Sequence, residues 1–127
     1  MKTIRQTYII NSSIEEVWKA LVNPEYIEKW GGGPAEMNDK AGTEFKLWDG
    51  DIHGKNIEIE PLKKLKQEWF GGNWSQPSTT TFTLKKKADK VRIDLLQINV
   101  PDNEVKNIDD GWKEYYLGPL KQFLENK

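Results

Sequence analysis

The spacing of hydrophobic residues changes period three times along this chain, and those changes constrain the fold more than any other feature. A segment with period two, Thr3–Ile10, comes first, and two helical segments follow it. Five more segments with period two come next, and the chain closes on a long helical stripe. An antiparallel sheet curled around the last helix would bury all these apolar faces at once. The order predicts an α+β protein with a six-stranded curved antiparallel sheet and two short helices after the first strand.

The two helices have recognisable starts. Ser12 and Ser13 each precede a glutamate by three residues, which is the spacing of a capping box, and an apolar stripe then continues to Val22. Pro24 favours a second helix that runs to Trp30. The five later strands are expected at Thr43–Trp48, Ile52–Glu60, Leu62–Phe70, Ser78–Lys86 and Val91–Val100.

Three irregularities are expected within this pattern. Asp49–Asp51 reads as a tight hairpin turn, and Gly118-Pro119 should kink the last helix. In the last strand the apolar residues change from odd to even positions, which predicts a β-bulge between Leu95 and Leu96.

Composition narrows the class of protein. The 127 residues suit one domain over 1–127, and 19 basic against 20 acidic residues give no electrostatic reason to expect nucleic acid or a membrane surface as a partner. Cysteine is absent, which excludes disulfides and thiol chemistry and suits a reducing compartment. No apolar run is long enough for a signal peptide or a membrane span. We therefore expect a cytoplasmic protein.

Six tryptophans give the chain more large aromatic surface than a polar sequence of this size needs. Indole rings favour cores, pocket walls and interfaces. With no cysteine and a single histidine, the sequence points to a binding protein more than to an enzyme, and it implies no cofactor.

Four groups of residues, in order and at consistent spacing, carry a family resemblance. They are Gly42-Thr43-Glu44-Phe45 with Asp49-Gly50, Gly54 and Glu60-Pro61; Leu65 with Trp69; Gly111-Trp112-Lys113-Glu114-Tyr115-Tyr116; and Glu15-Val17-Trp18 with Asn23-Pro24. From Thr3 to Glu125 the chain resembles the START and birch-pollen-allergen-like (SRPBCC) superfamily. Within it, the chain most resembles the C-terminal domain of the activator of the heat-shock protein 90 ATPase. The resemblance implies a helix-grip fold, often with an apolar cavity between the sheet and the last helix. It also implies a heat-shock protein 90-type chaperone as a candidate partner.

Aromatic residues on the expected gripping faces are the candidate ligand-binding site. They are Trp30, Phe45, Trp48, Trp69, Phe82, Trp112, Tyr115 and Tyr116. One interpretation is a cavity wall that contacts a small apolar or aromatic ligand. The other is a filled core, since a stripe at helical spacing usually packs against its own protein.

Trp74 is the candidate residue for partner binding. It lies in the polar loop Gly71–Pro77 without a periodic apolar partner. An exposed indole is a good interface anchor. The alternative is that the indole folds back over the sheet and only covers it. Two lysine clusters, Lys63–Lys66 and Lys85–Lys90, could add a patch for an acidic protein, although solvated faces are their commoner role.

Catalytic and metal-binding signals are weak. His53 has no orienting partner in its strand, and Asp109-Asp110 reads as acids placed early in a helix. No cluster of ligands has metal spacing, and Gly31–Gly33 lacks the lysine of a phosphate loop. The first hypothesis is a non-enzymatic binding domain, the second is a chaperone-interacting module, and the third is a cyclase- or dehydratase-like enzyme.

Overall fold

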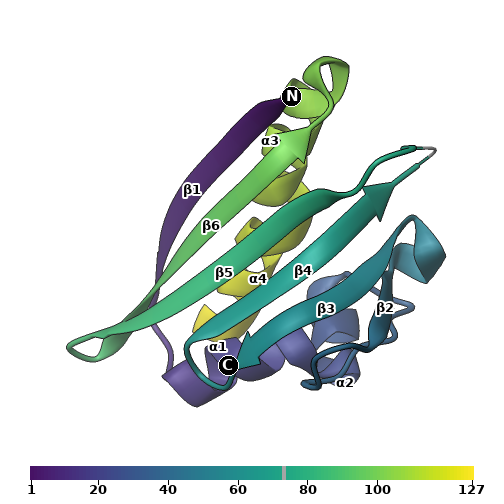
Figure 1. The fold of residues 1–127 in the computed structure, drawn as a ribbon. Coiled ribbons are helices and arrows are strands. Elements are labelled where there is room, and N and C mark those ends of the chain that lie inside the picture. Colours follow the sequence, from purple (N-terminus) through teal and green to yellow (C-terminus); the bar gives the residue numbers. More distant parts are fainter. Residues whose placement is uncertain (73) are drawn as a thin grey trace.

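The computed structural model describes residues 1–72 and 74–127 and shows an antiparallel sheet with helices on one face (Figure 1). Its six strands lie in the order β1-β6-β5-β4-β3-β2. The elements are β1 (Lys2–Ile10), α1 (Ile14–Val22), α2 (Pro24–Trp30), β2 (Glu44–Leu47), β3 (Ile52–Glu60), β4 (Lys64–Gly71), β5 (Ser78–Lys87), β6 (Lys90–Val100), α3 (Val105–Gly111), a π-helical turn (Trp112–Tyr116) and α4 (Leu117–Glu125). The predicted α+β class and strand number are confirmed. Asn73, within the predicted loop Gly71–Pro77, lies outside the described residues.

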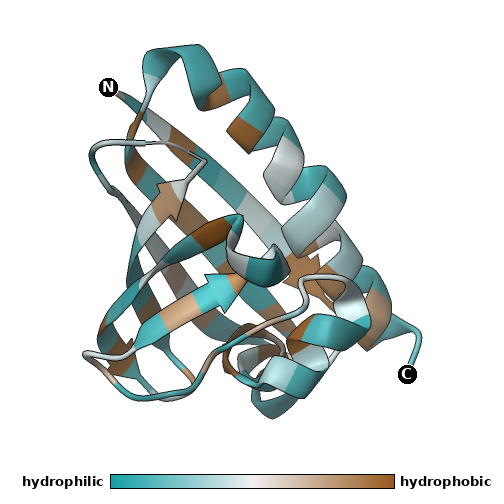
Figure 2. Ribbon diagram, turned by 90° about the vertical axis from the view of Figure 1, so that its right-hand side faces the viewer, coloured by the Kyte–Doolittle hydropathy of each residue, from teal (hydrophilic) through white to brown (hydrophobic). Residues whose placement is uncertain are grey.

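The sheet curves, and the C-terminal helical segments run along its concave side (Figure 2). Inward positions meet across neighbouring strands, where Leu65 pairs with Phe82 and Phe82 pairs with Leu95. All three side chains are buried. The core therefore lies between the sheet and the helices, as the periodicity predicts. Among residues 1–72 and 74–127, every helix is too short or too polar to traverse a lipid bilayer.

Side chains at the helix ends explain where the first two helices begin. The N–H of Glu16 donates to Ser13 Oγ at 3.2 Å, so Ser13 and not Ser12 caps α1. Asn23 Oδ1 accepts from the N–H of Tyr26 at 3.2 Å, and Pro24 takes the first helical position of α2.

The predicted bulge in the last strand is placed wrongly. Odd positions of β6 stay buried through Gln97, and the register shifts only after it, near Asn99, whose φ is 63°. Leu96 is half-buried and Ile98 is exposed on the convex face. The prediction failed because a polar residue, Gln97, occupies an inward position that the apolar pattern assigned to its neighbours.

Two predicted strands are longer than the observed ones because the backbone turns at their ends. Trp48 ends β2 with a φ of 49°, and Asp49 and Gly50 continue in positive φ before β3 begins. Leu62 has a φ of 66°, so β4 begins at Lys64. Trp48 therefore belongs to the turn between β2 and β3, not to a strand.

The last helix is irregular one turn before the predicted kink. The N–H of Leu117 donates to the carbonyl of Trp112, the pairing of a π-helix. Pro119 supplies no N–H to the preceding turn. A Cβ on Gly118 would lie 1.9 Å from the carbonyl oxygen of Lys113, so this close approach needs a glycine. Gly118-Pro119 thus marks the irregularity, but the widened turn is Trp112–Tyr116.

Candidate functional site

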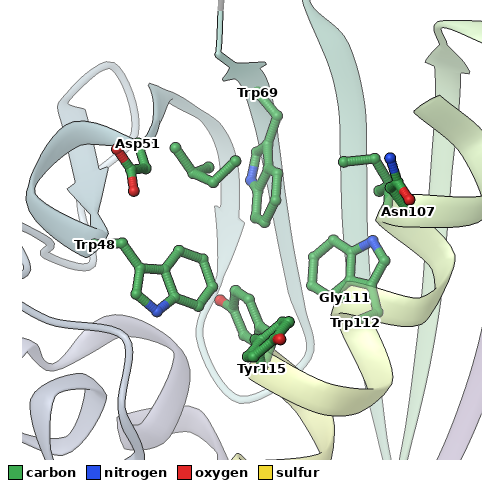
Figure 3. Close-up of a pocket in the computed structure, with 10 residues that line it drawn as sticks. Trp48, Asp51, Trp69, Asn107, Gly111, Trp112 and Tyr115 are labelled. Atoms are coloured by element: carbon green, nitrogen blue, oxygen red, sulfur yellow. The ribbon is translucent and has the colours of Figure 1, made fainter. Parts of the chain in front are cut away.

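A cavity of about 310 Å³ opens between the C-terminal helical segments, β4 and the turn between β2 and β3. Half of its ten lining residues are aromatic, and the ten come from three parts of the chain. They are Trp48, Asp51, Ile52, Trp69, Asn107, Ile108, Gly111, Trp112, Tyr115 and Tyr116. Figure 3 shows Trp48 and Asp51 on one side of this pocket and Asn107, Gly111 and Trp112 on the opposite side. We call it the aromatic pocket.

The rings of the aromatic pocket pack against one another. Trp69 of β4 stacks on Trp112 with ring centroids 4.7 Å apart and planes inclined by 28°. Tyr116 lies 4.8 Å from Trp112 and 6.1 Å from Trp48, measured between ring centroids. Trp69 and Trp112 are buried, and Trp48 is half-buried. Aromatic side chains thus form both walls of the pocket and join it to the core.

Each indole N–H of the pocket donates to a group within the protein. Trp69 Nε1 donates to Gln67 Oε1, and Trp112 Nε1 donates to Gln97 Oε1, both at 2.8 Å. Trp48 Nε1 donates to the carbonyl of Gly31 at 2.8 Å. These bonds orient the three rings, and their donors are already occupied.

Gln67 and Gln97 belong to a row of buried polar side chains that crosses the sheet. Asn56 faces Gln67, Gln67 faces Thr80 and Thr80 faces Gln97 on successive strands. Gln67 Nε2 donates to Asn56 Oδ1, and Gln97 Nε2 donates to Ser78 Oγ, each at 2.8 Å. A buried amide with both ends hydrogen-bonded can hold a neighbouring ring in one orientation. The row therefore acts as a polar support beneath the pocket.

The Tyr116 hydroxyl differs from the hydrogen-bonded amides of that row. Like the hydroxyl of Thr80, it has no hydrogen-bond partner within the described part of the chain. The surrounding rings withdraw it from water, and this burial raises the pKa of Tyr116 well above its ordinary value. Tyr116 therefore carries a buried, neutral hydroxyl that makes no hydrogen bond with the described residues.

Comparison with known proteins identifies the family. Residues 11–125 match the family model described as activator of Hsp90 ATPase homolog 1-like protein. The chain belongs to this family. A human relative, "Activator of 90 kDa heat shock protein ATPase homolog 1", is 24% identical over 122 residues. The match covers 94% of this chain but only 36% of the relative's length.

Solved structures share the fold of this family member. "PFC0360w, an HSP90 activator from plasmodium falciparum" superposes with a TM-score of 0.89 at 21% identity, covering 98% of this chain and 96% of the other. CalU16 from Micromonospora echinospora has a TM-score of 0.78 at 25% identity, and the superposition covers 96% of this chain and 74% of CalU16. The expected helix-grip fold of the SRPBCC type is confirmed.

The structure places the eight aromatic residues predicted for the site in two groups. The first group lines the aromatic pocket: Trp48, Trp69, Trp112, Tyr115 and Tyr116. Tyr115 is 64% exposed, so it lies at the mouth and not on the buried gripping face. The second group, Trp30, Phe45 and Phe82, is buried in the core and does not line the pocket. Five of the eight residues thus border a cavity and three belong to the filled core. That the five contact a ligand stays a prediction.

The predicted interface residue, Trp74, is not a freely exposed anchor. It is half-buried, and a Cβ on Gly71 would lie 3.3 Å from the six-membered ring of Trp74. The backbone N–H of Trp74 donates to the Gly71 carbonyl at 3.0 Å. The indole has folded back on the end of β4, which is the alternative that the sequence left open.

Sequence reasoning missed half of the pocket lining: Asp51, Ile52, Asn107, Ile108 and Gly111. Helical spacing carried a signal for the last three, because they lie on α3 within one and a half turns of Trp112. Asp51 lies in the turn after Trp48 and had no periodic signal, and the pattern of the predicted strand Ile52–Glu60 did not indicate which face Ile52 occupies. Gly111 contributes open space to the pocket because it has no side chain, and a Cβ there would meet no atom within 4 Å.

The weaker catalytic candidates lie outside the pocket. His53 is exposed on the convex face and stacks on Phe70, with ring centroids 5.5 Å apart. Asp109 accepts a hydrogen bond from Gln6 at 2.8 Å, and Asp110 pairs with Lys106 at 3.1 Å. In the described residues, no group of three or more His, Cys, Asp and Glu side chains could hold a metal ion.

Proposed function

We propose that this family member holds a small apolar or aromatic molecule in the aromatic pocket and does not act on it chemically. The observation that carries the proposal is the cavity of about 310 Å³ whose lining includes five aromatic side chains. Pockets for small molecules begin at about 300 Å³ and are mostly apolar with a few polar groups. Burying apolar ligand surface there would contribute about 2.5 kcal/mol for each 100 Å².

The groups available in the pocket support binding without catalysis. The titratable side chains that line it are Asp51, Tyr115 and Tyr116. Because burial raises the pKa of Tyr116, its phenol stays protonated and is a poor general base. Asp51 would have to act alone, without a histidine or a second carboxylate in the lining.

Gly111 offers a direct test of the binding function. Gly111→Leu would project a side chain into empty space while replacing a helical glycine with a better helix former. We expect the purified protein to bind the neutral dye N-phenyl-1-naphthylamine, with a rise in dye fluorescence, and Gly111→Leu to weaken this binding at least tenfold. Glu114→Leu is the matched control, because it adds the same side chain at an exposed position outside the pocket.

Native mass spectrometry of freshly purified protein complements the titration. A stoichiometric adduct that Gly111→Leu lacks and Glu114→Leu retains would place a natural ligand in the pocket. Equal dye affinity in all three proteins, with circular dichroism unchanged, would contradict the proposal.

A second candidate function is interaction with a heat-shock protein 90-type chaperone and modulation of its ATPase. The relatives are named as activators of that ATPase, although the chain spans only about a third of their length. The β5–β6 turn also presents Lys85, Lys86, Lys87 and Lys90, all exposed, which suits an acidic protein surface. This function would place the protein in the cytoplasm.

The chaperone function predicts a salt-dependent association. We expect the ATPase rate of the chaperone to change on addition of the protein, and this effect to weaken when Lys85, Lys86 and Lys87 are replaced by Glu. Trp74→Ala tests the half-buried indole in the same assay. An unchanged ATPase rate at every ratio of the two proteins would exclude this function.

A further inference from the structure

The charged lining of the aromatic pocket has one sign only. Its lining contains one carboxylate, Asp51, and no lysine, arginine or histidine. The other residues of the lining that carry a polar group are Asn107, Tyr115 and Tyr116, and the hydroxyl of Tyr116 is buried. An anionic ligand would therefore meet a like charge and no opposite charge, whereas a cation would meet Asp51.

The rings favour the same sign of charge. The indole N–H groups of Trp48, Trp69 and Trp112 all donate to groups within the protein. What these side chains offer to a ligand is therefore their carbon surface and their π-electrons. The face of an aromatic ring is electronegative and attracts ammonium groups, most strongly when the ring is an indole. Three indoles and two phenols around one space create an environment in which a cation is favoured over an anion.

Asp51 is free to meet such a cation. Its side chain is exposed, and its carboxylate has no hydrogen bond or ion pair with the described residues. Figure 3 shows it beside Trp48, across the pocket from Asn107. A charge at this place can attract a ligand to the mouth without the penalty of burying a carboxylate.

We propose that the ligand of the aromatic pocket is an organic ammonium ion with apolar substituents, seated against the indole rings with Asp51 as its counter-ion. This inference rests on the proposed binding function and adds the chemical class of the ligand. The rings bind both the apolar substituents and the charge, and Asp51 discriminates between a cation and a neutral molecule of the same shape.

Two probes of equal shape and different charge test the inference. Phenyltrimethylammonium carries a positive nitrogen where tert-butylbenzene carries a neutral carbon. Each is titrated against the complex of the protein with N-phenyl-1-naphthylamine, and its dissociation constant is obtained from displacement of the dye. We expect the cation to bind at least fivefold more tightly than the neutral probe at low salt.

Asp51→Asn should weaken phenyltrimethylammonium binding five- to tenfold and leave tert-butylbenzene within twofold. Asp49→Asn is the matched control, since Asp49 is an exposed acid of the same turn that does not line the pocket. It should change neither dissociation constant by more than twofold. Circular dichroism of both variants verifies the fold.

The outcomes separate the two proposals. If tert-butylbenzene displaces the dye as well as the cation does, or if Asp51→Asn affects both probes equally, the ammonium inference is overturned while the binding function stands. If the dye itself does not bind, the binding function fails, and the ammonium inference fails with it.

Discussion

The space between the sheet and the C-terminal helices is filled differently at its two ends. Near the β5–β6 turn it contains branched aliphatic side chains, which we call the aliphatic half: Ile10, Val17, Leu21, Leu84, Val91, Ile93 and Leu124. At the other end lies the aromatic half, with Trp48, Trp69, Trp112 and Tyr116. The residues of the aliphatic half are at most 4% exposed, whereas the aromatic half contains the pocket.

The difference shows how one core can be closely packed at one end and leave a cavity at the other. Branched aliphatic side chains interdigitate until little space is left between them. Flat rings whose N–H groups are hydrogen-bonded to Gln67, Gln97 and the Gly31 carbonyl cannot turn to fill a gap. The absence of a side chain at Gly111 leaves that gap open. We expect stability to depend mainly on the aliphatic half and ligand binding on the aromatic half.

The largest stability effect should come from the aliphatic half. Leu21 is fully buried on α1, and Leu21→Ala should lower the free energy of unfolding by about 2–5 kcal/mol because it leaves a cavity. Leu21→Met, which nearly conserves volume, should cost less than about 1.5 kcal/mol. Urea denaturation measures both changes. A Leu21→Ala variant as stable as the parent protein would show that this half is not closely packed.

The next effect concerns the polar support of the aromatic half. Gln97→Leu removes the acceptor of the Trp112 indole, so a buried N–H is left without a partner. The free energy of unfolding should fall by about 1–3 kcal/mol. The emission of Trp112 should also change as its ring loses its fixed orientation. Gln122→Leu, at an exposed position of α4, should stay within about 0.5 kcal/mol of the parent protein.

A substitution at Tyr116, in the pocket lining, should raise the free energy of unfolding and not lower it. Tyr116→Phe deletes a buried hydroxyl that has no partner among the described residues, and it should raise the free energy of unfolding by about 1 kcal/mol. Tyr115→Phe alters a hydroxyl at the exposed mouth and should be close to neutral. Destabilisation by Tyr116→Phe would mean that the hydroxyl has a partner, such as a bound water or ligand.

The smallest effect is a pH dependence outside the pocket. The Lys127 ammonium and the Tyr26 hydroxyl donate to Glu16, and these hydrogen bonds lower the pKa of that carboxyl. Because the folded-state pKa is the lower one, this stabilisation is present above the ordinary glutamate range and is lost as the pH falls through the folded-state value. Glu16→Gln should reduce stability by roughly 0.5 kcal/mol at pH 7 and flatten the acid side of the profile.

Urea denaturation at a series of pH values, with Glu15→Gln as the exposed neighbouring control, measures this contribution. An identical acid profile in Glu16→Gln and the parent protein would show that the hydrogen bonds to Glu16 do not contribute to stability.

Much of the site could be predicted because it follows from local spacing. Trp112 and Tyr116 recur at helical spacing, and Trp69 lies on the same face of a strand as Leu65, so their inward direction is visible in the chain. Gln97 could not be placed in the same way. Its inward position depends on where the register shifts against β1, and its burial depends on Ser78 and Trp112, which are distant in the sequence.

The amino-acid sequence alone determined the class of fold, the order of strands and helices along the chain, the start of the first helix to within one residue and the surplus of aromatic residues. These features arise from interactions between near neighbours and from which face of each element is apolar. Tertiary structure alone decided that Trp30, Phe45 and Phe82 fill the core while Trp48, Trp69 and Trp112 enclose a pocket. It also brought Asp51 to the mouth of that pocket. Whether a ring closes a core or borders a cavity depends on the side chains that three separated segments bring to one place.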